Sequence, residues 1–334
     1  MNKIALIMPY FGKFPNYFEL WLKSASYNET IDFYIFTDIE YDKYLPKNVH
    51  IVNMTFDEIK KRAQSIVDFS IVLNDYYKLC DYKPAYGLIF SDYLEEYDFW
   101  GHCDPDIIWG NIRNFLTEDI LNEYDRVFTF GHLSVYRNNN TINNSFKYNK
   151  QDVGHDKYIS TYEDAFKTSY ICHFDEWGGY SRYAELKGIN QYDERPFADI
   201  DATRFAFYTS DVNDKVGQVF SYKLGELIGY WIENGVIKSK EYAYIHLQKR
   251  SMQLNIGKNE MEKFLIVPNK FIPYSDIDIK KISEYGKNKV YFAWYRKRVN
   301  MIIDNIKKGA IKRRIDRALN IRRKNESNSI NTNV

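Results

Sequence analysis

Short apolar runs alternate with amphipathic stretches along the first third of the chain. The runs are rich in β-branched and aromatic residues and end at polar or turn-forming residues, which predicts buried strands at 3–8, 31–36, 49–53 and 99–103. The stretches between them have helical spacing and predict helices at 14–27, 56–67 and 85–95, the second opened by a Thr55-Phe-Asp-Glu58 capping box. Alternating strands and helices favour βαβ units with a largely parallel sheet.

The same pattern continues past the fourth strand. It predicts a helix at 111–122, a strand at 126–130 and an Asn-rich surface loop at 138–149. We therefore expect an α/β fold, with a mixed, mostly parallel sheet flanked by helices, over residues 1–265. Residues 266–289 are expected to be a connector.

Two carboxylates follow the strand at 99–103 directly. Asp104 and Asp106 flank Pro105, which fixes its own φ and keeps Asp104 out of the helical region. Both side chains are thus expected at the carboxyl end of a strand, where open α/β sheets bind ligands, and paired carboxylates suit a divalent cation such as Mg²⁺. The alternative is a solvated Asp-Pro-Asp turn.

Polar residues near other predicted element ends are candidates for the same rim. Pro9 and Tyr10 follow the first strand, and Asp38 follows the second, where it is also compatible with a simple turn. Lys83 precedes a predicted helix, so it either reaches a phosphate or is solvated.

An acidic, glycine-containing segment lies in the middle of the chain. Asp175 and Glu176 precede Trp177 and two glycines, a composition that suits a loop close to a ligand. Either acid is a candidate general base, and a tight turn with an incidental acid is the alternative.

The run from Tyr242 ends at His246, with Lys249 and Arg250 three and four residues on. A neutral histidine can complete a metal site, and the two cations can hold a diphosphate. The alternative for His246 is a hydrogen-bonded polar residue with no ligand.

Composition limits the class of protein. The chain has 334 residues, of which 27% are charged and 45% hydrophobic, as in globular proteins. The three cysteines lack a C-x-x-C spacing, which argues against a disulfide framework. The first apolar run is too short for a signal peptide, and no apolar run is long enough to cross a membrane. We therefore expect a cytoplasmic protein or one bound to a cytoplasmic membrane face.

Charge separates the C-terminal part from the rest. Residues 287–334 contain 14 Lys and Arg against three acids, a net charge of +11, so that with +1 overall the first 286 residues carry −10. Apolar residues at helical spacing between basic clusters predict a basic amphipathic helical tail over 290–324, which associates with the anionic inner leaflet. Nucleic acid is the alternative partner, but the acidic body and the lack of a nucleic-acid motif favour lipid. Residues 325–334 are expected to be disordered.

The order of three motifs resembles that of GT-A-type bacterial glycosyltransferases of capsule and O-antigen clusters. The motifs are Met-Pro-Tyr-Phe-Gly at 8–12, Cys-Asp-Pro-Asp at 103–106 and His-Leu-Gln-Lys-Arg at 246–250, and the resemblance covers residues 1–265. It implies that Asp104, Asp106 and His246 hold Mn²⁺ or Mg²⁺ on a nucleotide diphosphate. It further implies that Lys249 and Arg250 contact the phosphates, and that Pro9, Tyr10 and Asp38 face the nucleoside.

The function expected is transfer of a sugar from a nucleotide-diphosphate sugar, a UDP-sugar being the expected donor, to a lipid-linked or polysaccharide acceptor. A metal-dependent nucleotidyltransferase or phosphohydrolase is a second hypothesis, and a non-catalytic membrane-bound scaffold is a third. The chain has no G-x-x-x-x-G-K-[ST], G-x-G-x-x-G or H-E-x-x-H motif, which excludes the most common rival sites.

Overall fold

Alternate residues of the first strand, β1 (Ile4–Pro9), pack into two different hydrophobic cores. Ala5 and Ile7 face one core, and Ile4, Leu6 and Met8 face the other. A strand places successive side chains on opposite faces, so β1 is covered on both sides. The computed structural model that shows this describes residues 1–153, 159–176, 178–212 and 216–307.

β1 lies inside a mixed sheet of seven strands in the order β3-β2-β1-β4-β7-β6-β8. The first four pair in parallel, β7 is antiparallel to both β4 and β6, and β8 is parallel to β6. The other strands of this sheet are β2 (Ile31–Thr37), β3 (Val49–Asn53), β4 (Phe99–Cys103), β6 (Arg126–Phe130), β7 (Leu133–Arg137) and β8 (Gln191–Tyr192).

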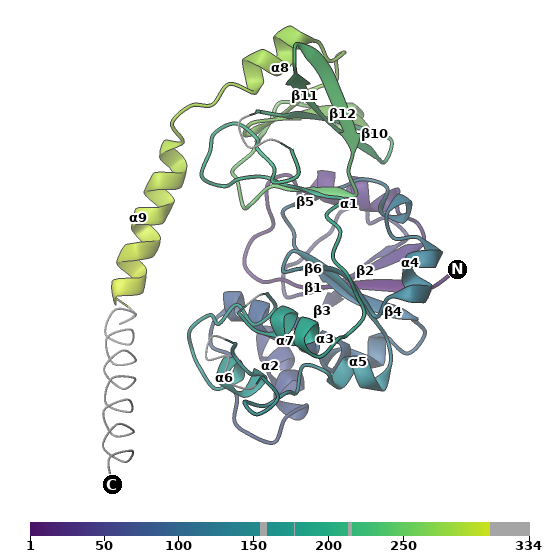
Figure 1. Cartoon of the computed structure of the whole chain (residues 1–334), viewed down its shortest axis with the longest axis vertical. Coiled ribbons are helices and arrows are strands. Elements are labelled where there is room, and N and C mark those ends of the chain that lie inside the picture. The colour runs from purple at the N-terminus through teal and green to yellow at the C-terminus, as the bar shows by residue number, and fades with distance from the viewer. Residues whose placement is uncertain (154–158, 177, 213–215, 308–334) are drawn as a thin grey trace, which may run out of the picture. The chain divides into compact units, whose positions relative to one another are not determined.

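Helices cover both faces of this sheet (Figure 1). One face packs against α2 (Phe56–Ser65), α3 (Tyr86–Ile89), α5 (Asn140–Asn144), α6 (Tyr162–Phe166) and α7 (Tyr180–Leu186). The other packs against α1 (Phe18–Ser26) and α4 (Glu118–Glu123), with aromatic residues such as Trp21 and Trp109 fully buried between the layers.

Two smaller mixed sheets lie beyond α1. A three-stranded sheet has the order β5-β13-β9, formed by β5 (Ile107–Trp109), β13 (Tyr244–His246) and β9 (Ala198–Asp199). A six-stranded sheet has the order β12-β11-β10-β15-β16-β14. Its strands are β10 (Val219–Lys223), β11 (Glu226–Glu233), β12 (Val236–Glu241), β14 (Gln253–Leu254), β15 (Lys263–Val267) and β16 (Lys270–Pro273), and α8 (Ile279–Tyr285) packs on it through Ile282.

Strand β5 joins these layers because its successive side chains point into two different hydrophobic cores. Ile107 and Trp109 face the core under the large sheet, whereas Ile108 enters the core shared with the six-stranded sheet. The short connection from β4 to β5 therefore passes from one sheet to the next, and it contains Asp104 and Asp106.

The fold confirms the α/β class and the predicted strands of the large sheet. Three expectations were wrong. The helix expected at 85–95 is the single turn α3 followed by a 3₁₀ helix Ser91–Tyr93, and a longer 3₁₀ helix Tyr76–Ala85 precedes both. The segment is divided at Phe90, whose φ of −117° and ψ of 25° are not helical. The helix expected at 111–122 is a 3₁₀ helix Ile112–Asn114 followed by α4, which Thr117 caps. The loop expected at 138–149 contains α5 and buries Ile142, Phe146 and Tyr148, so it is part of the core.

The part of the chain from Asn288 onward groups with Ala202–Phe205 as a unit separate from Met1–Asp201 and Ala206–Lys287. Its described part includes the helix α9 (Phe292–Lys307), whose exposed residues include Phe292, Tyr295 and Val299. The rest of the predicted tail, from 308 to 334, lies outside the described residues. Among the described helices, none combines the length and apolarity needed to span a bilayer.

A buried asparagine joins the end of α1 to the strand that follows Asp106. The Asn28 amide donates to the carbonyls of Ser24 and Gly110 at 3.2 and 3.0 Å and accepts from the Ile112 amide at 2.9 Å. Asn48 in turn donates to the Asn28 carbonyl at 3.0 Å. These bonds fix the far end of β5 against α1.

Replacing Asn28 by alanine is expected to lower the free energy of unfolding by about 2–4 kcal/mol, because it leaves buried backbone groups of Gly110 and Ile112 unpaired at ~1–3 kcal/mol each. Urea denaturation of Asn28→Ala measures this loss. Asn53→Ala, at an exposed position of β3, is the control and should change stability by less than about 0.5 kcal/mol. Equal effects of the two variants would contradict the role of Asn28.

Candidate metal centre

Asp104 and Asp106 form the connection between β4 and β5 and differ in exposure. The Asp106 side chain is 3% exposed and that of Asp104 is 24% exposed. The Trp21 indole N–H donates to the Asp104 carbonyl at 3.2 Å, so α1 holds the backbone of the turn. The two carboxylates thus leave the carboxyl end of a central strand, as the sequence predicted.

Strand pairing brings His246 to these carboxylates from 140 residues further along the chain. In the antiparallel β5–β13 pair His246 lies opposite Ile107, so it is next to Asp106. The Leu247 amide donates to the Asp106 carbonyl at 2.8 Å and the Lys249 amide to Asp106 Oδ2 at 2.5 Å. His246 Nε2 lies 3.4 Å from the same Oδ2.

Asp104, Asp106 and His246 meet the geometric requirement for a cation. Each offers a ligand atom within 4.8 Å of those of the others. Asp106 Oδ1 is buried and has no hydrogen-bond partner among the described residues, a costly arrangement that a bound cation would relieve. Two carboxylates and one imidazole are an oxygen-rich set compatible with Mn²⁺ or Mg²⁺, the imidazole being the better match to Mn²⁺.

Without a cation, Asp106 and His246 form a buried ion pair. Burial by itself would lower the pKa of His246, but Asp106 and Asp199 raise it to about 10. Burial would likewise raise the pKa of Asp106, but His246 and the Lys249 amide hold it well below its usual range. A proton on the imidazole therefore occupies the place where a divalent cation would bind.

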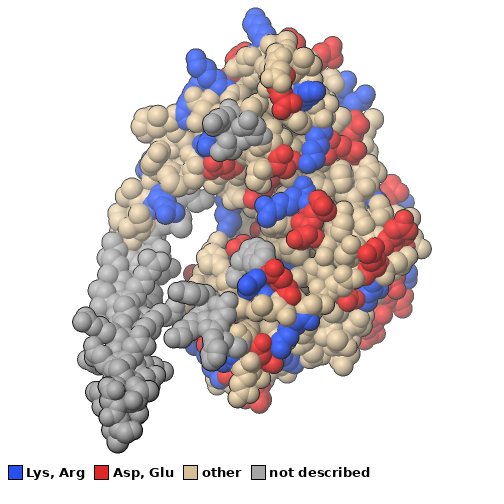
Figure 2. All heavy atoms as spheres, in the orientation of Figure 1, with Lys and Arg blue, Asp and Glu red and all other residues tan. Residues whose placement is uncertain are grey.

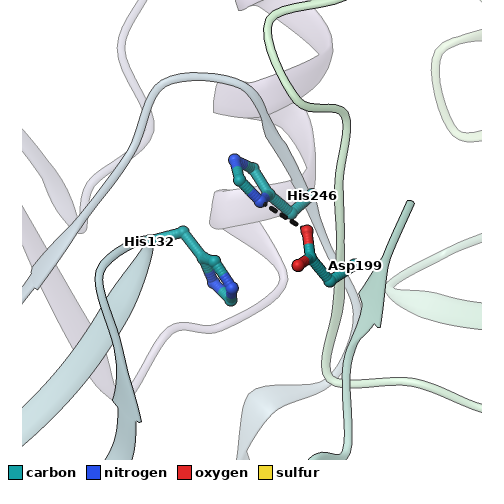
Figure 3. A group of neighbouring side chains, drawn as sticks. All are labelled: His132, Asp199 and His246. Carbon is teal, nitrogen blue, oxygen red and sulfur yellow. Dashed lines mark hydrogen bonds and ion pairs between the residues drawn. The ribbon is translucent and has the colours of Figure 1, made fainter. Parts of the chain in front are cut away.

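A third carboxylate orients His246 from the other side of the ring. Asp199, in β9, lies opposite His246 in a parallel register, and its Oδ1 is 2.9 Å from His246 Nδ1 (Figure 3). The Gln248 amide donates to the same oxygen at 2.6 Å. Carboxylates of this kind fix the tautomer of a metal-binding histidine. The sequence analysis missed Asp199 because its two-residue strand has no detectable periodicity.

His132 is a second residue that the sequence analysis missed. It follows β6, its Nδ1 is hydrogen-bonded to Tyr244 Oη at 2.9 Å, and its ring centroid lies 4.4 Å from that of His246. Burial lowers the pKa of His132 to about 3, so the ring is uncharged at neutral pH. Its position just after a buried strand was the available signal, the same one that identified Asp104.

Lys83 lies between two of the predicted acids. Its ammonium contacts Asp104 Oδ1 at 2.8 Å, donates to the Gly131 carbonyl at 2.5 Å and lies 3.9 Å from Asp175 Oδ2. Burial raises the pKa of Asp175 to about 7, although Lys83 acts in the opposite direction. The structure thus links Asp175 to the metal centre through one buried cation.

The loop before Asp175 is held by another buried ion pair. Lys78 donates to Asp81 at 2.6 Å, and the Asp81 carboxylate accepts the amides of Cys172 and Phe174 at 2.9 Å each. Both side chains of the pair are at most 1% exposed. Because Phe174 is the residue before Asp175, this pair positions the Asp175 loop.

Gly131 lies against the carboxylates of the two acids at 175 and 176. A Cβ there would lie 2.6 Å from Glu176 Oε1 and 2.9 Å from Asp175 Oδ2. Glu176 is otherwise half-exposed, 3.8 Å from His173 Nδ1.

The remaining predicted residues, Pro9, Tyr10 and Asp38, follow the strands β1 and β2 and differ in exposure. Pro9 ends β1, and the Tyr10 side chain next to it is half-buried; burial and the charge of Asp106 raise the pKa of Tyr10. Tyr10 stacks on Phe14 with ring centroids 5.4 Å apart. Asp38 is exposed in the bend after β2.

Lys249 and Arg250 point to different partners. The Lys249 ammonium lies 4.0 Å from the Tyr77 ring centroid, and the charges of Asp104 and Asp106 help to raise its pKa. Arg250 donates to the Asp201 carbonyl at 2.7 Å and to Asn269 Oδ1 at 3.4 Å. Gln248 and Lys249 have φ values of 52° and 55°, a left-handed turn that is uncommon for such residues.

The chain belongs to the protein family described as "Family of unknown function (DUF6625)", whose model matches residues 6–275. That range contains every residue of the candidate metal centre and excludes α9. No curated protein matches the chain.

Replacing Asp175 by asparagine is expected to flatten the pH dependence of stability. The folded protein binds the Asp175 proton up to pH about 7, whereas the unfolded chain releases it near 3.8, so this group lowers stability as pH rises between those values and has no further effect above 7. The full effect is on the order of 4 kcal/mol at most. Urea denaturation from pH 4 to 8 measures it. Glu226→Gln, at an exposed position of β11, is the control and should keep the wild-type slope, whereas an unchanged slope in Asp175→Asn would contradict the assignment.

Proposed function

We propose that this protein is a metal-dependent glycosyltransferase that uses a nucleotide-diphosphate sugar, with a UDP-sugar as the expected donor. The observation that carries the proposal is the convergence of Asp104, Asp106 and His246 on one buried spot with an unpaired Asp106 oxygen. The fold supports it, because the parallel β3-β2-β1-β4 order is that of a nucleotide-binding half, with the carboxylates at the carboxyl end of β4. The finer GT-A assignment is part of this proposal.

Mn²⁺ or Mg²⁺ held by Asp104, Asp106 and His246 would supply a Lewis acid for the charge on the departing nucleoside diphosphate. The chain's own residues prepare that site. Lys83 holds one oxygen of Asp104, the Lys249 amide holds one oxygen of Asp106, and Asp199 holds the His246 ring. Each ligand thus has a second contact that fixes its orientation.

The residues around the metal centre would bind the donor. Lys249, next to both carboxylates and packed on Tyr77, supplies positive charge for a phosphate. Arg250 holds the strained 248–249 turn through Asp201 and Asn269, in addition to its predicted phosphate role. The stacked rings of Tyr10 and Phe14, together with Pro9, would provide an apolar surface for the nucleoside, and Asp38 would supply a polar contact to it.

Asp175 is the better supported of the two candidate bases. A group that accepts a proton from a sugar hydroxyl works best with a pKa near the operating pH, and the Asp175 pKa of about 7 meets that condition. Glu176 is the more exposed of the two and stays the second candidate.

Two alternative functions can be distinguished from the proposed glycosyltransferase by experiment. A nucleotidyltransferase or phosphohydrolase could use the same carboxylates, and would respond to nucleoside triphosphates instead of diphosphate sugars. A scaffold in which Asp-Pro-Asp is only a turn is less compatible with a 3%-exposed carboxylate that has an unpaired oxygen. Thermal-shift scanning with nucleoside triphosphates, diphosphates and their sugars, with and without Mn²⁺, separates the three.

Replacing Asp106 by asparagine should abolish Mn²⁺-dependent binding of nucleoside diphosphates, at least a 100-fold loss of affinity, because the neutral amide cannot replace a charged ligand. Calorimetric titration of UDP with Mn²⁺ measures this. Asp32→Asn removes another Asp–His pair, with His50 at 2.9 Å in β2 and β3, and should bind like the wild type. If Asp106→Asn kept wild-type affinity, the carboxylates would not be the nucleotide site.

The proposal includes peripheral attachment to the cytoplasmic face of a membrane through residues 290–324. In α9, the exposed apolar residues are spaced so that they share one side of the helix, at Phe292, Tyr295, Val299, Ile302 and Ile303. Arg296 and Arg298 are exposed beside them. An apolar face bordered by cations is the pattern of an interfacial helix.

The protein face seen in Figure 2 gives no site for a nucleic acid among the described residues. Acidic and basic side chains are interspersed there, without one continuous basic area among the described residues on that face. A nucleic-acid site would need such an area. A lipid-linked acceptor would explain why a transferase is held at a membrane.

Putting two glutamates on the apolar side of α9, as Phe292→Glu with Val299→Glu, should reduce sedimentation with anionic liposomes at least tenfold, because it removes the apolar contact. The control is Ala293→Glu with Asn300→Glu, which makes the same change of charge at other exposed positions of the helix and should retain much more binding. Equal loss in both double variants would show that charge alone attaches the protein. Undiminished binding in the first would contradict the membrane assignment.

A further inference from the structure

His132, Asp199 and His246 face one another next to the proposed nucleotide site (Figure 3). They come from three separate elements, namely the turn after β6, the strand β9 and the end of β13. Each offers a ligand atom, and these atoms lie within 4.8 Å of one another. His132 and His246 are 8% and 7% exposed as whole residues.

His132 has one nitrogen with a partner and one without. Its Nδ1 is hydrogen-bonded to Tyr244 Oη at 2.9 Å, whereas its buried Nε2 has no partner within the described part of the chain. A metal-binding histidine commonly has this arrangement, with one nitrogen fixed by a hydrogen bond and the other left for the ion. A buried nitrogen without such a use is costly.

We infer that His132, Asp199 and His246 form a second metal site, selective for a transition-metal ion such as Zn²⁺. The ligands would be His132 Nε2, the Asp199 carboxylate and His246 Nδ1. Two imidazoles and one carboxylate are a ligand set that Zn²⁺ prefers over Mg²⁺, and three protein ligands leave a position open. The Asp199 side chain is 36% exposed, which gives an ion access from solvent.

This site shares His246 with the proposed nucleotide site, and the rest of the inference depends on that proposed function. His246 faces Asp199 through Nδ1 and Asp106 through Nε2. A neutral imidazole has a lone pair on one nitrogen only. An ion on Nδ1 therefore leaves a proton on Nε2, directed at Asp106, and the two sites exclude each other. Zn²⁺ would thus inhibit the Mn²⁺-dependent reaction.

Titration of the full chain with Zn²⁺ alone, by calorimetry and by the absorption of Co²⁺ used as a substitute, tests the site. The wild type should bind one ion, and His132→Gln and Asp199→Asn should each weaken binding at least tenfold. His50→Gln, which alters the surface pair with Asp32, is the control and should bind like the wild type. Tyr244→Phe removes only the hydrogen bond to His132 and should weaken binding less than His132→Gln does, which keeps the test valid if the latter is unstable. No Zn²⁺ binding by the wild type, or undiminished binding by His132→Gln and Asp199→Asn, would overturn the site.

Asp104→Asn separates this inference from the proposed function. It should retain Zn²⁺ binding and lose Mn²⁺-dependent UDP binding, because Asp104 belongs to the nucleotide site only. Retention of both would refute the proposed function and leave the Zn²⁺ site intact. Loss of Zn²⁺ binding in Asp104→Asn together with its retention in His132→Gln would place the ion at the carboxylates and overturn the inference. In the wild type, Mn²⁺ with UDP should weaken Zn²⁺ binding at least tenfold, and an unchanged affinity would refute the sharing of His246.

Discussion

The pairing of β5 with β13 is the constraint on which the candidate site depends. Three residue pairs join the two strands, and the last places His246 opposite Ile107. This pairing brings His246, and the left-handed turn that follows it, next to Asp106. A lone buried carboxylate would be neutralised by protonation. Here an imidazole and a backbone amide keep Asp106 charged. The surrounding layers, with α1 on one side and the six-stranded sheet on the other, serve to hold this short sheet in place.

The charged groups of the site form two neighbouring sets of three. Asp199, His246 and Asp106 are joined through the two nitrogens of one ring, and Asp104, Lys83 and Asp175 through one ammonium. Opposite charges therefore alternate among buried and partly exposed groups, which reduces the cost of desolvating the buried ones. A substitution of any one of these groups changes the electrostatic environment of its neighbours, so the effect of a single substitution reports on more than one contact.

The sequence predicted the parts of this arrangement that have a local signal. The strand β4 and the acids after it were found because a buried run followed by Asp-Pro-Asp is visible within eight residues, and the capping box at Thr55 was confirmed by its hydrogen bonds. His246 was selected from its position at the end of an apolar run. Asp199 and His132 were missed because their importance comes only from pairing across long separations. The helices expected at 85–95 and 111–122 were too long, since helical spacing does not reveal where a non-helical residue such as Phe90 or a new cap such as Thr117 divides a segment.

Gly131 offers a way to recognise related sequences that have the same chemistry. A larger residue there would crowd the side-chain ends of two acids, one of which is the buried Asp175 beside the Lys83 ammonium, so these carboxylates would have to shift. A relative with alanine or serine at the equivalent position is therefore expected to hold these two acids in other side-chain conformations. The pair formed by this glycine and the buried acid, 44 positions apart, is thus a fingerprint that can sort members of the family by whether they retain the arrangement.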